Sequence, residues 1–387
     1  MKAFKITDEV YWVGAIDWDL RNFHGYQTEQ GSTYNAYLII DEKITLIDTV
    51  KNKFCGEMIK RISSIIDLTQ IDYIISNHVE MDHSGSIQKL VENIDNVEVL
   101  SSTQGKKGLN AHFDIRNWNI KAVNPGNTLD LGENKLHFVL TPMVHWPDNM
   151  VTYLENENIL FSNDAFGQHY ASYERFDHQI PLDVVMKEAK KYYANIVMPY
   201  GSQVEKVLKK VNNLNIDIDT IAPSHGIIWE NNIKEILEQY NKWCTNKTQE
   251  EALIVYDSMW GSTEKLAYTL YEFFEEKKIT TNIKNLDKTH RSNIIPHILD
   301  ADYVCIGSPT LNNNMLPSIS AFLTYLKGLS PGGKKAIAFG SYGWGGQSIN
   351  QVKDELEKAD FQVIDTIDTE YVPGRQELEN IKDNITL

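Results

Sequence analysis

The sequence predicts an α/β protein with two domains, and two observations support this. The first is length, because 387 residues exceed what a single domain usually holds. The second is a change of rhythm near residue 250. Before that point strand patterns follow one another with helices beside them, which predicts a two-layer β core flanked by helices. After it strands and helices alternate strictly, which predicts a doubly wound parallel sheet. The predicted domains are therefore residues 1–250 and 251–387.

Strand patterns open the first domain. Apolar and β-branched residues gather at 10–13, 34–40 and 44–48, and residues 41–43 predict a hairpin turn between the last two. Helical spacing of apolar residues follows at 58–66. Further strands are predicted at 73–75, 97–100, 136–140, 150–154 and 159–162, and helices at 184–193 and 232–243.

Five strand patterns, with helical stretches between them, make up the second domain. The strands are predicted at 252–256, 281–284, 303–307, 336–340 and 362–364, and helices include 264–275 and 318–326. Parallel strands need crossover connections of this length, so one parallel sheet is expected. In such sheets ligands bind beyond the carboxyl ends of the strands, which makes the loops there candidate sites.

Charge and cysteine content exclude several classes of function. The formal net charge of −16 argues against a nucleic-acid partner, because phosphate binding needs a basic surface. Cys55, Cys244 and Cys305 are far apart, so neither a disulfide framework nor a cysteine-bound cluster is expected. The first residues carry no apolar signal region, and no run approaches the roughly 18–20 apolar residues of a membrane span. We therefore expect a cytoplasmic protein that does not bind membranes.

The stretch 77–85 carries the densest chemical signal in the sequence. Four potential metal ligands, His78, Glu80, Asp82 and His83, lie within six residues of one another. In an extended backbone the first three would point to one side and His83 to the other. That arrangement suits one loop that serves two neighbouring metal ions. A polar turn between a strand and a helix is the alternative interpretation.

Three later loops carry the same chemistry and contribute His145, Asp164 and His225. Seven ligands are too many for one four-coordinate zinc, but they suit two ions with a bridging carboxylate. Asp164 is the best candidate for the bridge, because it stands alone between two separated histidine loops. Taken singly, each of the three residues could instead be structural. Carboxylates and imidazoles suit iron or manganese as well as zinc. His24 is a candidate for the pocket wall, whereas His169 and five other histidines lie outside any such loop.

Three strand ends in the second domain carry candidate ligand-binding loops. Residues 257–264 open a helix and offer hydroxyl and backbone N–H groups to an anion. This loop lacks the glycine patterns of nucleoside triphosphate and dinucleotide sites. Residues 308–314 offer amide groups, and residues 340–346 offer aromatic rings and glycines for a flat ring. A helix N-cap alone would explain the first loop, and a glycine-rich turn alone would explain the third, but together the three loops favour flavin mononucleotide (FMN).

The His-x-Glu-x-Asp-His loop, followed by His145, Asp164 and His225, resembles the flavodiiron proteins, also called A-type flavoproteins. This resemblance covers essentially the whole chain. It implies a metallo-β-lactamase-like αββα sandwich followed by a flavodoxin-like doubly wound parallel sheet. Zinc hydrolases of the lactamase fold usually show His-x-His-x-Asp-His. Here Glu80 stands at the second histidine position, which is the iron signature of the flavodiiron family.

The resemblance also implies roles for individual residues. One iron would be bound by His78, Glu80 and His145, the other by Asp82, His83 and His225, with Asp164 as the bridge. His145 is the position at which some family members do not ligate directly. Tyr192 matches a tyrosine beside the ligands, with Tyr193 as its alternative, and Tyr192 and His24 are the candidate catalytic residues. The implied FMN-binding residues are Ser258, Met259, Trp260, Gly261, Ser262, Thr263, Pro309, Thr310, Leu311, Asn312, Asn313, Ser341, Tyr342, Gly343, Trp344, Gly345 and Gly346.

The family reduces O2 to water or NO to N2O with electrons passed through FMN, and the resemblance implies one or both activities here. It also implies a head-to-tail homodimer or tetramer in which the FMN of one subunit lies beside the irons of another. No cysteine-rich module follows Leu387, so we expect a separate electron donor, either rubredoxin or reduced deazaflavin F420. The sequence does not choose between O2 and NO.

Two other functions remain possible at the level of the sequence. One is a zinc-dependent hydrolase of the lactamase fold with a regulatory flavodoxin-like domain, against which Glu80 argues. The other is an electron carrier or sensor with a structural metal site. Metal analysis and gas consumption would separate these alternatives from the diiron reductase.

Overall fold

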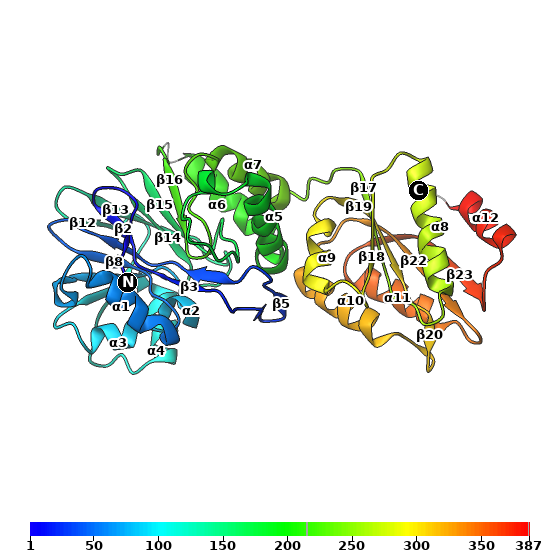
Figure 1. The fold of residues 1–387 in the computed structure, drawn as a ribbon, viewed down its shortest axis with the longest axis horizontal. Helices are drawn as coiled ribbons and strands as arrows, with labels where there is room; N and C mark the ends of the chain where they lie inside the picture. Colours follow the sequence, from blue (N-terminus) through cyan, green and yellow to red (C-terminus); the bar gives the residue numbers. More distant parts are fainter. Residues whose placement is uncertain (214–215, 386) are drawn as a thin grey trace. The chain divides into compact units, whose positions relative to one another are not determined.

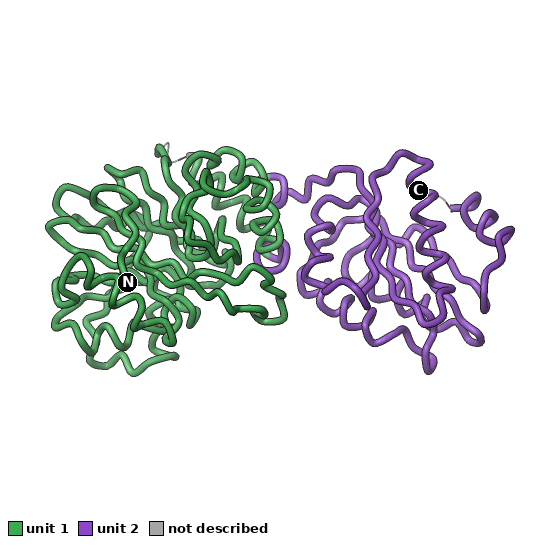
Figure 2. The backbone as a smooth tube through the Cα atoms, viewed as in Figure 1, with its two compact units in different colours: residues 1–193, 200–241 green, residues 194–199, 242–387 purple. Residues whose placement is uncertain are grey.

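A computed structural model describes residues 1–213, 216–385 and 387 of the chain (Figure 1). The chain forms two compact units, which Figure 2 distinguishes by colour. The first contains residues 1–193 and 200–241, and the second contains residues 194–199 and 242–387. The domain division at residue 250 stays a prediction, and each unit is described by itself below.

Two sheets form the core of the first unit. In the described part of the chain the larger sheet has the order β1-β2-β7-β8-β9-β10-β11, and the smaller has the order β12-β13-β14-β15-β16. The larger sheet consists of β1 (Phe4–Lys5), β2 (Val10–Trp12), β7 (Tyr37–Ile39), β8 (Thr45–Ile47), β9 (Tyr73–Ser76), β10 (Glu98–Ser102) and β11 (Asn119–Val123). The smaller consists of β12 (Thr128–Asp130), β13 (Lys135–Leu140), β14 (Met150–Leu154), β15 (Ile159–Asn163) and β16 (Thr220–Pro223). Two short ribbons pair β3 (Ala15–Asp17) with β6 (Ser32–Tyr34) and β4 (Asn22–Phe23) with β5 (Tyr26–Gln27).

Alternating side chains on the strands produce four layers, α/β/β/α. In β9, Ile74 packs among the residues of the outer helices, whereas Ile75 packs between the two sheets. In β14, Met150 packs between the sheets, whereas Val151 belongs to a separate cluster on the other face. The helices beside the larger sheet are α1 (Cys55–Ile62), α3 (Ile87–Val91) and α4 (Thr103–His112). Those beside the smaller sheet are α6 (Gly201–Asn213) and α7 (Ile233–Cys244). The first unit is thus a metallo-β-lactamase-like sandwich.

The predicted strand at 34–40 is interrupted in the structure. β6 ends at Tyr34 and β7 begins at Tyr37, so Asn35 and Ala36 lie between them. The buried Asn35 side chain accepts a hydrogen bond from Trp12 Nε1 (2.8 Å) and donates one to Pro223 O (2.8 Å). Its backbone N–H donates to Ser224 O (2.8 Å). The interruption therefore holds the loop that carries His225 against the larger sheet.

The second unit is built on one parallel sheet with the order β18-β17-β19-β22-β23. Its strands are β17 (Glu251–Tyr256), β18 (Thr281–Asn285), β19 (Ala301–Gly307), β22 (Lys335–Tyr342) and β23 (Gln362–Glu370). Its helices are α8 (Ser262–Glu276), α9 (Arg291–Ile298), α10 (Pro317–Leu329), α11 (Gln347–Lys358) and α12 (Arg375–Asn384). This strand order is that of flavodoxin-like folds, which confirms the predicted doubly wound sheet.

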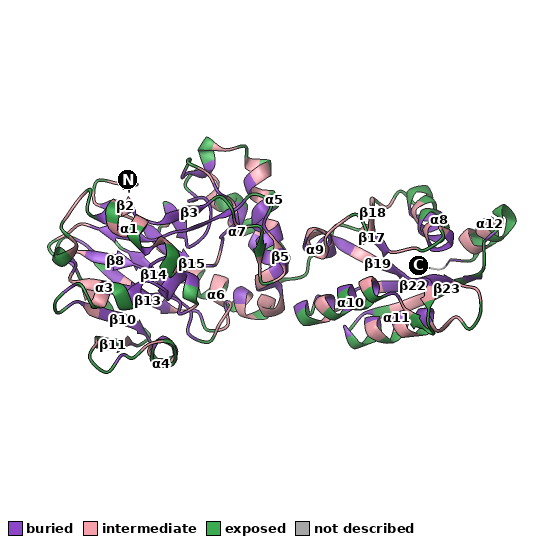
Figure 3. Cartoon of the chain, turned by 60° about the horizontal axis from the view of Figure 1, so that its bottom comes forward, coloured by how far each residue is buried: buried purple, intermediate pink, exposed green. Residues whose placement is uncertain are grey.

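Burial follows the same layers in each unit, with the central strands and inward helix faces buried, edge strands such as β18 half-buried, and outer helix faces exposed (Figure 3). Among the described residues, no helix combines the length and the apolar character that a membrane-spanning segment requires.

Candidate functional site

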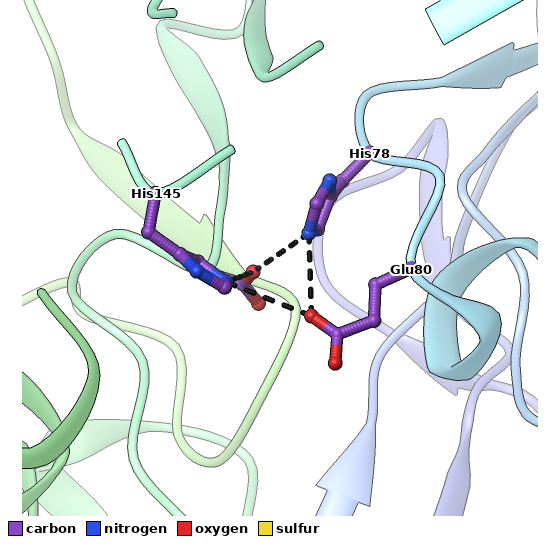
Figure 4. A group of neighbouring side chains, drawn as sticks. His78, Glu80 and His145 are labelled. Atoms are coloured by element: carbon purple, nitrogen blue, oxygen red, sulfur yellow. Dashed lines mark hydrogen bonds and ion pairs between the residues drawn. The ribbon is translucent and has the colours of Figure 1, made fainter. Parts of the chain in front are cut away.

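The seven predicted metal ligands lie together in the first unit. Their ligand atoms form two groups, and within each group these atoms lie within 4.8 Å of one another. One group is His78, Glu80, His145 and Asp164, and the other is Asp82, His83 and His225. Figure 4 shows His78, Glu80 and His145 pointing toward one another. The ligands lie just beyond β9, β13, β15 and β16, so the ends of strands from both sheets converge on one place.

Asp164 lies between the two groups and offers one carboxylate oxygen to each. Its Oδ2 is 3.2 Å from His145 Nε2 and 3.6 Å from His78 Nε2. Its Oδ1 is 3.1 Å from His83 Nε2 and 3.5 Å from His225 Nε2. This is the geometry that a bridging carboxylate requires.

Most of these short distances are not hydrogen bonds. His78 Nε2, both ring nitrogens of His83, both carboxylate oxygens of Asp82 and Asp164 Oδ1 are buried without a hydrogen-bond partner among the described residues. Such atoms are costly to bury unless something else binds them. Two ligand atoms that bind one ion at about 2.0–2.2 Å, at right angles, lie about 3 Å apart. The observed spacings are close to this value, so the residues fit a pair of metal ions.

Opposite charges in the two groups shift the pKa values of the ligands. Burial lowers the pKa of His83, but the carboxylates of Asp82 and Asp164 outweigh this effect and raise it to about 9. Burial likewise opposes ionisation of Asp164, yet the imidazoles of His83, His145 and His78 hold its pKa well below its usual range. The site therefore favours anionic carboxylates, which suit divalent cations once the imidazoles have released their protons.

Two contacts outside the groups orient the histidines. His78 Nδ1 lies 2.8 Å from Asp148 Oδ2, and that oxygen also accepts a hydrogen bond from Val79 N (2.8 Å). His225 Nδ1 donates to the backbone oxygen of Thr33 (2.7 Å). Both contacts leave Nε2 directed at the site, as is usual for histidines that bind metals. Asp148 was missed by sequence reasoning, although its position three residues after His145 and the frequent pairing of ligand histidines with carboxylates were available signals.

The backbone at Asp82 differs from the extended loop that the sequence analysis expected. Met81–Ser84 form the short helix α2, which begins directly after Glu80. Ser84 Oγ stabilises this turn by donating to Val79 O (2.7 Å) and Glu80 O (3.1 Å). A helical turn rotates successive side chains, so Asp82 does not point in the same direction as His78 and Glu80. Its Oδ2 instead lies 3.3 Å from His225 Nε2. The prediction that Asp82 points with His78 and Glu80 is therefore wrong.

His24 lies at the exposed edge of the site. Its side chain is 76% exposed, and its Nε2 is 3.2 Å from Glu80 Oε1. His24 thus contacts a predicted ligand from the solvent side.

Tyr192 and His169 close the buried side of the second group. Tyr192, the last residue of α5 (Leu182–Tyr192), is buried with its ring centroid 5.9 Å from that of His225. Tyr193 instead packs on Tyr240, with centroids 5.1 Å apart. His169, which the sequence analysis set aside, is buried with its ring 5.0 Å from both Tyr192 and His225. No local pattern around residue 169 indicated this position.

The predicted FMN loops lie at the carboxyl ends of β17, β19 and β22 in the second unit. The first and third loops touch, because Thr263 Oγ1 lies 2.8 Å from Ser341 Oγ. Gly261 has φ = +83°, a conformation that glycine adopts without strain. The side chains of Trp260 and Trp344 are highly exposed, at 92% and 80%. Hydroxyl donors at the start of α8 and aromatic rings nearby suit a phosphate and a flat ring.

Comparisons with known proteins match this two-part architecture. Residues 33–226 match the family described as ODP family beta lactamase, and residues 254–382 match the flavodoxin family. The chain is 42% identical over 361 residues to the nitric oxide reductase of Moorella thermoacetica, covering 93% of this chain and 90% of that protein. It is 40% identical over 386 residues to the rubredoxin-oxygen oxidoreductase of Megalodesulfovibrio gigas, covering 99% and 96%.

Solved structures show the same relationship. The flavodiiron protein from Giardia intestinalis superposes with a TM-score of 0.96 at 32% identity, covering 99% of this chain and 95% of that one. Identity at these levels extends over nearly the full length of the chains, and both family matches fall on the corresponding units. From its two units, its paired ligand groups and these relatives, the chain belongs to the flavodiiron protein family.

Proposed function

We propose that this protein is an oxidoreductase that reduces O2 to water, NO to N2O, or both, with electrons that reach a diiron centre through FMN. The observation that carries the proposal is the pair of ligand groups joined by Asp164. The names of the relatives, an oxygen oxidoreductase and a nitric oxide reductase, support both substrates.

The proposed ligands divide as the two groups do. His78, Glu80 and His145 would hold one iron, and Asp164 would bridge to the other. The second iron would be held by the remaining members of the set, which are Asp82, His83 and His225. When bound, a pair of iron ions supplies electrons and Lewis acidity for the reduction of a small gas.

Residues beside the ligands have proposed roles in proton supply, because reduction of either gas consumes protons. His24 is exposed and its Nε2 contacts Glu80 Oε1, so its imidazole can exchange protons with water at the edge of the site. Burial raises the pKa of Tyr192 well above its usual value, and the charges of Asp164 and Asp82 add to this effect. Its phenol therefore stays protonated at neutral pH and can act as a hydrogen-bond donor.

In the second unit, the loops at 258–263, 309–313 and 341–346 are the proposed FMN site. Hydroxyl and backbone N–H groups of the first loop would hold the phosphate, and the exposed Trp260 and Trp344 would contact the flavin. We place the functional division between the iron-binding and FMN-binding parts at residue 250.

Partners, assembly and location complete the proposal. Rubredoxin is the proposed donor, as the name of the M. gigas relative supports, and reduced F420 is the alternative. A head-to-tail homodimer or tetramer would bring the FMN of one subunit to the irons of another. A cytoplasmic location is supported by Cys55 and Cys305, which are buried thiols outside any disulfide. The zinc hydrolase alternative is not favoured, because the near-full-length relatives named above are oxidoreductases.

Steady-state gas consumption tests the proposal directly. Full-length protein loaded with iron and FMN would be mixed anaerobically with reduced rubredoxin and either O2 or NO, each followed with an electrode. We expect donor oxidation that requires the gas, and the ratio of the two rates gives the substrate preference. Stoichiometric zinc with no consumption of either gas would contradict the proposed function.

A further inference from the structure

A small cavity lies between the outer face of the smaller sheet and helices α6 and α7. Its volume is about 60 Å³. Val151 and Leu160 form its floor on the sheet, and Val204 and Val207 of α6 form part of its roof. Its wall is mainly aliphatic. Figure 1 shows α6 and α7 beside β14 and β15, the strands that carry Val151 and Leu160.

Part of the cavity wall comes from two of the loops that carry predicted metal ligands. Val144 and Ala165 line the cavity, and they are the sequence neighbours of His145 and Asp164. Consecutive Cα atoms lie about 3.8 Å apart. The backbone of each of these two lining residues is therefore about that far from the backbone of the neighbouring predicted ligand. Phe166 also lines the cavity, and its N–H donates to Tyr240 Oη (2.6 Å).

A surface depression of about 660 Å³ adjoins the cavity, and its rim carries charged residues such as Glu230 and Lys234. Four residues line both the depression and the cavity, namely Leu208, Asn212, Ile218 and Leu237. Asn212 is exposed, whereas the three aliphatic residues are half-buried, so their side chains separate solvent from the interior. These three side chains thus form a partition between the depression and the cavity, called the neck below, which a gas molecule would have to cross.

The size and polarity of this passage select its occupant. A cavity lined by aliphatic groups gives water few hydrogen-bond partners, and such cavities stay dry and take up apolar guests such as xenon. Ions and larger polar molecules would lose their hydration at the neck. O2 and NO are small, uncharged and weakly hydrogen-bonding, and a volume of about 60 Å³ accommodates one diatomic molecule.

We propose that this cavity and its neck are an apolar route by which O2 or NO enters from solvent and reaches the metal-ligand loops. This inference rests on the proposed function for the identity of the gas. It assigns gas entry to the side of the unit formed by α6 and α7, whereas His24, with its proposed role in proton supply, is exposed at the Glu80 edge.

Two substitutions on α6 test the route. Leu208→Trp places a bulky ring at the neck, and Val207→Phe fills the cavity itself. Lys206→Trp is the matched control, because residue 206 lies on the same helix but is exposed and lines neither space. All three would be made in full-length protein, with iron content, FMN content and the rate of FMN reduction by the donor measured first.

Two readouts decide the outcome. Xenon pressed into crystals should occupy the cavity in the native protein and in Lys206→Trp, but not in Val207→Phe. In stopped-flow mixing, the second-order rate of NO or O2 uptake by the reduced protein should fall roughly tenfold in both blocking variants and stay unchanged in the control.

Unchanged uptake rates in Val207→Phe, with its xenon site lost, would overturn the route and leave the proposed function intact. Absence of xenon from the native cavity would also overturn it, without any reference to turnover. Native protein that takes up neither gas would instead refute the proposed function, and the route with it.

Discussion

Asp164 shows how one residue can organise a site that two sheets and four loops supply. It follows β15 directly, and the oxygens of its carboxylate point to different ligand groups. The other six predicted ligands each belong to one group. A carboxylate at this position both joins the groups and supplies negative charge to each, which no neutral side chain of the same size can do.

Asp164→Asn should therefore abolish gas reduction while FMN stays bound. The amide keeps the shape of the side chain but loses the charge and leaves only one oxygen for two ions. Iron analysis, flavin absorbance and gas-electrode rates would be measured together. Asp95→Asn is the matched control, because residue 95 is exposed in the same unit. Native rates in Asp164→Asn would refute the bridging role.

At the residue scale, sequence reasoning identified positions that carry their own chemical signal. The seven predicted ligands converge in the structure because their types and loop positions were visible in the chain. Asp148 and His169 were missed, since their contacts depend on folding. His78 and Asp148 are 70 residues apart, and His169 reaches Ser32 across 137 residues. Nothing adjacent to His169 in the sequence indicates its partner, and the proximity of Asp148 to His145 does not identify His78 as the histidine that it contacts.

Among the elements, α2 had the least support in the sequence and has the greatest effect on the site. A helix of four residues has no apolar periodicity to reveal it. By contrast, helices α7 and α8 and strands such as β14, β15 and β17 were predicted close to their observed bounds. β11, β12 and β16 were not predicted, and the prediction at 362–364 covers only the first part of β23. The interruption at Asn35 escaped prediction because it is imposed by the contact with Pro223, which is distant in sequence.

Gly85, which follows α2, should tolerate no side chain. A Cβ there would lie 2.3 Å from Met81 O and 3.1 Å from Asn52 N, so the helix carrying Asp82 and His83 would have to move. Gly85→Ala should therefore lower both iron content and thermal stability.

Gly56→Ala provides the control for this change. Residue 56 is exposed within α1, and a Cβ there would meet nothing within 4 Å. Because Gly56 is the second residue of α1, its replacement should stabilise the protein by less than the roughly 0.5–1 kcal/mol of a mid-helix glycine, with iron content unchanged. Differential scanning calorimetry and iron analysis measure both variants. Native iron content and Tm in Gly85→Ala would show that the packing around α2 is not needed for the metal site.

For the whole molecule, the predicted iron ligands belong to the first unit and the predicted FMN loops to the second. Electrons must therefore pass from one unit to the other, either within a chain or between chains. The proposed head-to-tail assembly selects the second route. Mixed dimers distinguish the two routes, because one chain can be made without a working iron site and its partner without FMN.

One chain would carry Asp164→Asn, which keeps FMN but loses the bridge. The other would carry Gly261→Val, which should lose FMN because a β-branched residue is strained at φ = +83°. Each variant alone should be inactive. Dimers that contain one of each, isolated with two affinity tags, should regain up to half of the native rate, because the FMN of the first chain would face the intact iron site of the second. If electrons instead passed within each chain, neither chain of the mixed dimer would hold a complete pair, and the gas electrode would record no reduction.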